Sequence, residues 1–67
     1  MKIRVNGESF ETAGEGTVSD LLRELKVDAA RVAAVEVNLT IIKKADFPAF
    51  LLKDGDAVEI VNFVGGG

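Results

Sequence analysis

The stretch MKIRVNGESFE (residues 1–11) decides how the chain begins to fold. Apolar and polar residues alternate on both sides of Asn6-Gly7, a dipeptide typical of a two-residue hairpin turn because both central positions take positive φ. A turn of that length places Ile3 opposite Phe10 on one face, where both can be buried. The sequence therefore predicts an antiparallel β-hairpin over its first dozen residues.

A helix is expected to follow the glycine-containing turn at residues 14–16. Thr17 can cap its N-terminus, and Asp20 three residues further on completes a weaker form of the capping box. Four apolar residues then recur at helical spacing, namely Val18, Leu21, Leu22 and Leu25. Because this spacing makes one apolar stripe, it predicts a helix that packs across a sheet.

Three further strands are indicated by β-branched and apolar runs at residues 32–37, 40–42 and 57–63. Residues 43–50 show no clean period and contain Pro48, which lacks a backbone donor, so we expect a crossing segment there. Four residues are expected to hold this crossing segment against the core: Phe47, Phe50, Leu51 and Leu52.

The order β-β-α-β-β-β predicts an α+β domain, with one mixed sheet of about five strands and one main helix packed across one face. The first and last strands can then pair in parallel at the centre of the sheet. This arrangement resembles the ubiquitin-like β-grasp fold. We expect residues 1–63 to form that domain and residues 64–67 to form a flexible C-terminal glycine tail.

Composition narrows the chemistry of this 67-residue chain. It contains no Cys and no His, so we expect neither a metal site nor a catalytic residue. A net charge of −3 and a pI of about 4.7, without Tyr or Trp, disfavour a nucleic-acid partner. The apolar runs are far shorter than the about 18 residues that span a bilayer, and residues 1–20 lack the pattern of a signal peptide. We therefore expect a cytoplasmic protein with no membrane partner that is a monomer when free.

Two remaining polar clusters are interpreted as structural. Lys53-Asp54-Gly55-Asp56 has two carboxylates, too few for a Ca²⁺ loop, so it predicts a turn with Gly55 at positive φ. Lys43-Lys44 is expected to be solvated. The alternative for this pair is that it steers an acidic partner.

The most unusual stretch is the C-terminal run Val64, Gly65, Gly66 and Gly67, because glycines pack little and lose much entropy when ordered. Four extended residues reach about 13–14 Å, enough to place the Gly67 carboxylate inside another protein. We interpret residues 64–67 as a tail that enters partner active sites, since glycine lets a tunnel close around the backbone. A frayed end or a cloning remnant is the alternative interpretation.

The Gly67 carboxylate is a candidate for covalent modification. It is an anion at pH 7, far above the ordinary pKa of an α-carboxyl group, and therefore a poor electrophile. An acyl adenylate would give it a leaving group, and a sulfur nucleophile could then displace AMP to form a thiocarboxylate. The absence of Cys and His is consistent with this scheme, because the carrier itself needs neither a thiol nor a base.

The last predicted strand also offers a candidate docking patch. Alternation puts Val58 and Ile60 on one face of residues 57–63. If that face meets the helix, Val61 and Phe63 emerge on the outer surface of the sheet beside the tail, where they could bind a partner. The alternative is that the strand twists and Phe63 closes one end of the core.

Taken whole, the sequence resembles the ThiS family, the sulfur carrier proteins of thiamine (thiazole) biosynthesis. The resemblance covers essentially all 67 residues. It rests on residues 1–8, 17–22 and 35–38, and most specifically on residues 52–61 and 63–67. The segment 39–44 departs from the family's pattern, which usually has small or acidic residues and a Pro-Arg pair there.

The resemblance implies a β-grasp fold and a carrier protein that is not itself an enzyme and on which partner enzymes act. It implies that an E1-like adenylyltransferase activates Gly67 with ATP, that a sulfur-donor protein supplies the sulfur of a thiocarboxylate, and that a thiazole synthase accepts it. By the same resemblance, Gly66 and Gly67 enter both enzymes, and the carrier holds no cofactor of its own.

Three alternatives remain open. The small subunit of molybdopterin synthase is similar in fold and terminus, but it tends to be longer and to have a Pro-rich approach to the diglycine, whereas Asn62-Phe63-Val64 contains no proline. A ubiquitin-like modifier would use the same adenylated Gly67, with an amine as the attacking group. A plain interaction module would keep its activity after deletion of Gly66 and Gly67.

Overall fold

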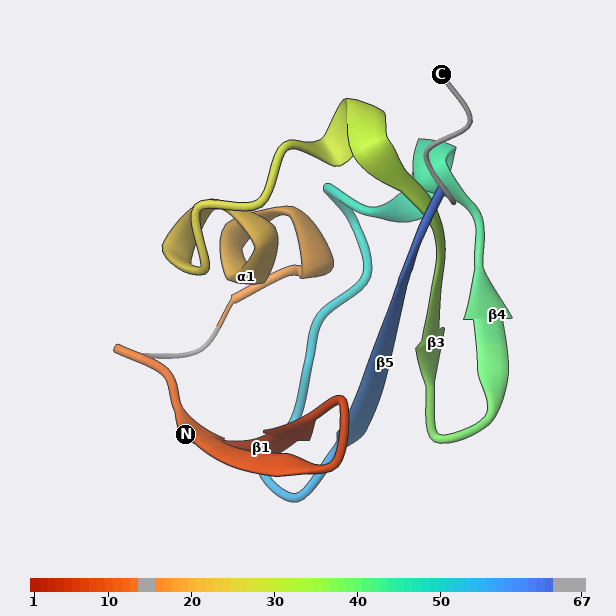
Figure 1. Ribbon diagram of the computed structural model, residues 1–67. Coiled ribbons are helices and arrows are strands. Elements are labelled where there is room, and N and C mark those ends of the chain that lie inside the picture. Colours follow the sequence, from red (N-terminus) through yellow and green to blue (C-terminus); the bar gives the residue numbers. More distant parts are fainter. Residues whose placement is uncertain (14–15, 64–67) are drawn as a thin grey trace.

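The computed structural model describes residues 1–13 and 16–63. The elements in chain order are β1 (Lys2–Val5), β2 (Glu8–Glu11), α1 (Val18–Glu24), the 3-10 helix η1 (Ala29–Arg31), β3 (Val32–Val37), β4 (Thr40–Ile42), the 3-10 helix η2 (Lys44–Asp46) and β5 (Ala57–Asn62). The strands form one five-stranded sheet in the order β2-β1-β5-β3-β4, with α1 on one side of it (Figure 1). Because β1 and β5 pair in parallel while the other neighbours pair antiparallel, the predicted α+β β-grasp arrangement is confirmed.

The N-terminal hairpin has the predicted register. Ile3 lies opposite Phe10, and Asn6 and Gly7 take φ values of 50° and 84° in the turn. The structure adds a role for the Asn6 side chain, whose Oδ1 accepts a hydrogen bond from the backbone N–H of Ile60 at 2.7 Å. The turn of the hairpin is therefore tied to the central strand β5.

The predicted capping box closes the N-terminus of α1. Thr17 Oγ1 accepts a hydrogen bond from the Asp20 N–H at 3.2 Å, and Asp20 Oδ2 accepts one from the Thr17 N–H at 2.9 Å. The bond from the Thr17 backbone is the main reason that the pKa of Asp20 lies below its usual value. Of the predicted stripe, Val18, Leu21 and Leu22 are buried and Leu25 is half-buried. Within residues 1–13 and 16–63, no helix is long and apolar enough to cross a membrane.

The crossing segment is held to the core by three of the four residues expected to do so. Phe47 and Leu52 are buried and Phe50 packs against the core, but Leu51 is 64% exposed, so the prediction for Leu51 is wrong. The backbone at Leu51 forms an isolated β-bridge to the N-cap residue of α1, and side chains on extended backbone point alternately to opposite sides. Since Phe50 and Leu52 point inward, Leu51 points outward.

The central strand β5 runs between β1 and β3 and has one face on the core. It ends at Asn62, one residue earlier than the sequence predicts. Val58 is buried, and Ile60 packs against the core from the same face, as expected from their spacing. The core itself consists of Ile3, Val18, Leu21, Leu22, Val32, Val35, Val37, Ile42, Phe47, Leu52 and Val58.

Candidate functional site

The exposed end of β5 is the described region that adjoins the predicted tail in the sequence. Val61 is 45% exposed and Phe63 is 61% exposed. Their exposure agrees with the predicted alternation, because Val58 on the opposite face of β5 is almost completely buried. The alternative in which Phe63 closes one end of the core is wrong, because most of its surface lies in solvent.

Two contacts fix the position of Phe63. Its backbone N–H donates to Arg31 O of η1 at 3.0 Å, and Lys44 Nζ lies 5.2 Å from the centroid of its ring. That separation is typical of a cation–π contact, which at an exposed site contributes about 0.5–1 kcal/mol. The sequence predicts a solvated Lys43-Lys44 pair, whereas the structure gives Lys44 an aromatic neighbour, which no periodic pattern in the crossing segment could have indicated.

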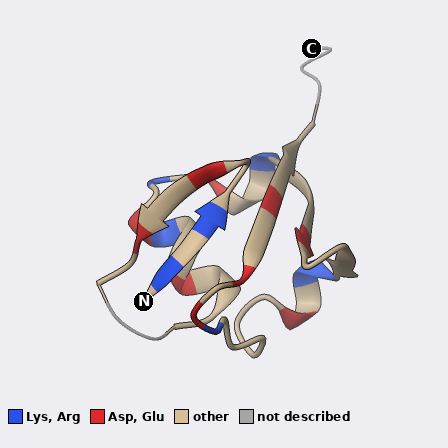
Figure 2. Cartoon of the chain, turned by 90° about the horizontal axis from the view of Figure 1, so that it is seen from below, with Lys and Arg blue, Asp and Glu red and all other residues tan. Residues whose placement is uncertain are grey.

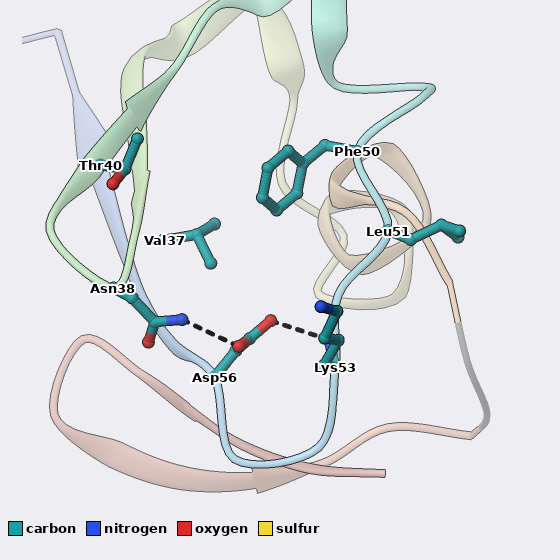
Figure 3. A pocket seen from close by; sticks show the side chains of 7 residues that line it. All are labelled: Val37, Asn38, Thr40, Phe50, Leu51, Lys53 and Asp56. Carbon is teal, nitrogen blue, oxygen red and sulfur yellow. Dashed lines mark hydrogen bonds between the residues drawn. The ribbon is translucent and has the colours of Figure 1, made fainter.

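The start of β5 is held by a hydrogen-bond network around Asp56 (Figure 3). The Asp56 carboxylate is largely buried and accepts hydrogen bonds from Asn38 Nδ2 at 2.9 Å and from the Lys53 N–H at 2.7 Å. Asn38 Oδ1 in turn accepts one from the Ala57 N–H at 3.0 Å. The network joins the β3–β4 turn to the turn before β5, in which Gly55 takes the predicted positive φ, 89°.

A hollow of about 350 Å³ lies beside this network and is bordered on one side by the exposed Leu51 (Figure 3). Its side-chain polar atoms on Asn38 and Asp56 are already engaged in the hydrogen bonds just described. In the part of the chain that the structure describes, no group of three or more His, Cys, Asp or Glu residues could hold a metal ion.

The four residues predicted to carry the chemistry lie outside the described residues: Val64, Gly65, Gly66 and Gly67. What the structure defines is the strand that leads to them. The side chains of Asn6 and Asn38, in the β1–β2 and β3–β4 turns, each bond a backbone N–H of β5, and the Arg31 carbonyl bonds the residue that follows the strand. Sequence reasoning identified the exposed Val61 and Phe63 but missed these positioning contacts, which join segments far apart in the chain.

The fold and the exposed end of its central strand define the class of this protein, a small ubiquitin-like β-grasp domain. Within that class, the comparison with known families is unambiguous. The chain belongs to the ThiS family, whose family model matches residues 3–67.

The chain is similar to individual members and relatives of that family. It is 46% identical over 67 residues to a thiazole synthase of Paramagnetospirillum magneticum, a match that covers all of this chain and 20% of the synthase. It is 36% identical over 66 residues to the sulfur carrier protein ThiS of Bacillus subtilis, covering 97% of this chain and 98% of that one. The crystal structure of the thiamine biosynthesis protein ThiS from Geobacter metallireducens matches with a TM-score of 0.85 and 41% identity, over the full length of both chains. This chain thus spans about a fifth of the thiazole synthase and nearly all of the Bacillus protein.

Proposed function

We propose that this protein is a sulfur carrier in thiamine biosynthesis and that the carboxylate of Gly67 is the group that is loaded. An E1-like adenylyltransferase activates this carboxylate with ATP, a sulfur-donor protein supplies the sulfur, and a thiazole synthase receives it. The observation that carries the proposal is the family match, which runs from residue 3 through residue 67 and so includes the glycine tail as well as the fold.

The proposed chemistry takes place at one carboxyl group. A carboxylate oxygen attacks the α-phosphorus of ATP and pyrophosphate leaves, which gives an acyl adenylate. A sulfur nucleophile such as hydrosulfide then attacks the acyl carbon, and AMP leaves with the electron pair of the broken C–O bond. Because no side chain of this protein is needed as nucleophile or base, the scheme fits a chain without Cys or His. The protein is a carrier, holds no cofactor, and leaves the catalysis to its partners.

The described part of the fold supports a carrier role through the way it holds β5. The strand pairs with β1 at Ala57 and Val58 and with β3 as far as Asn62, so β3 holds its C-terminal end. Beyond it, the four residues 64–67 could reach about 13–14 Å into a partner. Val61 and Phe63 are exposed next to this segment, and we assign them to the docking patch that partner enzymes contact.

Support for a thiazole synthase as the receiving partner comes from the relative in Paramagnetospirillum magneticum. That protein is named a thiazole synthase and contains a segment 46% identical to the whole of this chain. Joining two units in one polypeptide raises their effective concentration for each other, which favours units that act together. We therefore assign this chain a thiazole synthase as the acceptor of its sulfur.

The test is the intact mass of the protein after incubation with the adenylyltransferase of the same organism, ATP and a sulfide source. The expected result is a mass increase equal to the exchange of one oxygen for one sulfur, located on Gly67 by fragmentation. A variant that lacks Gly66 and Gly67 is the matched control and should remain unmodified. Absence of exchange in the intact chain would overturn the proposal.

Two other outcomes would favour a different function for this protein. Covalent adducts between this protein and lysine side chains in cells would favour a ubiquitin-like modifier. Stable co-purification with the large subunit of molybdopterin synthase would favour the molybdopterin branch. We favour the thiazole branch over both because of the ThiS family match.

A further inference from the structure

The face of the sheet opposite α1 carries a hollow of about 250 Å³, formed by β1, β3, β5 and the β3–β4 turn. Two carboxylates and one guanidinium line it, from Glu36, Glu59 and Arg4. In Figure 2, basic positions colour the strand that begins at the N label, and an acidic position lies along β5. The hollow therefore lies between β1, which contributes a basic residue, and β3 and β5, which each contribute an acidic residue. Its lining thus has two carboxylates and one guanidinium.

The two glutamates are direct cross-strand neighbours. Glu36 of β3 lies opposite Glu59 of β5, so both side chains project from the same face of the sheet. Like charges directly opposite one another destabilise a sheet. Among residues 1–13 and 16–63, the ion pairs within 4.0 Å are those of Glu11 and Asp20, so neither of these carboxylates has a cation in contact. The pair is an arrangement that a cation from outside would stabilise.

Apolar side chains border the glutamate pair. Ile41 of β4 lies directly opposite Glu36 and is 66% exposed, and Leu39 in the β3–β4 turn lines the hollow and is 90% exposed. Leu39 also has a φ of 68°, a left-handed conformation that is unfavourable for a residue with a Cβ. Folding alone would be better served by glycine at this position, so an exposed leucine there suggests selection for contact with another molecule.

The position of Leu39 in space is well defined by its neighbour. The Asn38 side chain bonds both Asp56 and the Ala57 N–H, which anchors the turn to the base of β5. On the same outer face, Val61 lies two residues beyond Glu59 along the strand that leads to residues 64–67. The hollow thus lies on the same face of the sheet as the docking patch assigned above, and Glu59 and Val61 are neighbours along that face, so one partner surface can contact both.

We infer that this hollow receives an arginine side chain of the thiazole synthase, with its guanidinium between Glu36 and Glu59 and an adjoining apolar group against Leu39 and Ile41. This inference rests on the proposed function, because the synthase is the partner named there. A guanidinium is planar and carries five N–H donors, so one arginine can bond two neighbouring carboxylates at once. Glu36 and Glu59 would then select the partner, while residues 64–67 deliver the sulfur.

The experiment measures the affinity of the full chain for the thiazole synthase of the same organism, by titration calorimetry at low and at high salt. Replacement of both glutamates, Glu36→Gln and Glu59→Gln, should weaken binding by about tenfold or more and flatten its salt dependence. Glu8→Gln on the edge strand β2 removes one charge from an exposed position and should leave the affinity within about twofold. The unfolding midpoint of the double variant should equal or exceed that of the parent, since a like-charge contact is removed.

Unchanged affinity in the double variant would overturn the inference alone, whereas a parent chain that does not bind the synthase would overturn it together with the acceptor named in the proposed function. Sedimentation gives a third criterion: a parent dimer that dissociates in the double variant would mean that a second copy of this chain occupies the face. Each of these results would leave the sulfur exchange on Gly67 as an independent measurement. The inference can therefore fail while the proposed function stands.

Discussion

The β1–β2 and β3–β4 hairpin turns take similar positive φ values and have different sequences. The β1–β2 turn uses Asn6 and Gly7, at φ values of 50° and 84°, and the β3–β4 turn uses Asn38 and Leu39, at 51° and 68°. In both, the asparagine side chain bonds a backbone N–H of β5. The second position differs: glycine adopts this conformation freely, and leucine does not.

This difference distinguishes a turn whose sequence is explained by folding from a turn whose sequence is explained by contact with a partner. Asn6-Gly7 is the combination expected if only the hairpin mattered. Leu39 occupies a strained position and exposes 90% of its surface, so its side chain contributes little to the core. The first turn is therefore explained by folding alone, and the second calls for the contact that we propose with the synthase.

Asn38→Ala is expected to have the largest effect on stability. It removes the hydrogen bonds to Asp56 and to the Ala57 N–H and places alanine at a positive φ, so we expect a loss of about 2–4 kcal/mol in the free energy of unfolding. Urea titration followed by circular dichroism measures this loss. The control Asn38→Gly keeps the backbone freedom without the hydrogen bonds and should recover about 1 kcal/mol of it. If Asn38→Gly were as stable as the parent, the network would have no energetic role.

Gly7→Leu makes the first turn resemble the second and should lower the free energy of unfolding by about 1–2 kcal/mol. A Cβ at Gly7 would meet no atom within 4 Å, so the loss reports backbone strain and not a clash. The same urea titration measures it, with Gly7→Asn as the control, because asparagine tolerates this conformation better than leucine. A neutral Gly7→Leu would remove the basis for calling Leu39 strained.

Local signals in the sequence explain which parts of the fold were predictable. The Asn6-Gly7 turn and the capping box of Thr17 and Asp20 each involve residues within a few positions of one another, so the hairpin register and the helix start follow from the sequence. The exposure of Val61 and Phe63 follows from the two-residue period of a strand.

Contacts between distant segments were not predictable in this way. The bond between Asn6 and Ile60 spans 54 positions, and the contact between Lys44 and Phe63 joins a segment without periodicity to the end of β5. Leu51 was assigned to the core because it is apolar, yet its neighbours on an extended backbone take the inward positions. The exposed side chains of the candidate site follow from the sequence, whereas the contacts that hold them follow only from the three-dimensional structure.

Leu39→Gly tests the second turn directly and should move stability and binding in opposite directions. Relief of backbone strain, partly offset by the greater entropy of an unfolded glycine, should raise the free energy of unfolding by about 0.5–1 kcal/mol. The affinity for the thiazole synthase should fall, because an exposed apolar contact is lost. Urea titration and calorimetry on the same samples measure the two quantities. A gain in stability with unchanged affinity would show that Leu39 contacts no partner there.

Phe63→Ala should have the smallest effect on stability, and it extends the comparison from Leu39 to an exposed apolar residue near the tail. Phe63 is 61% exposed and the Lys44 ammonium lies beside its ring. Truncation should therefore cost less than about 1 kcal/mol of unfolding free energy while it weakens partner binding. Lys44→Gln is the matched variant, since it keeps the ring and removes only the cation. If Lys44→Gln reproduced the loss of affinity, the contact with the partner would depend on how Lys44 holds Phe63. If only Phe63→Ala lost affinity, the partner would contact the ring itself. A drop in stability of several kcal/mol in Phe63→Ala would contradict both readings, because a ring in solvent has little packing to lose.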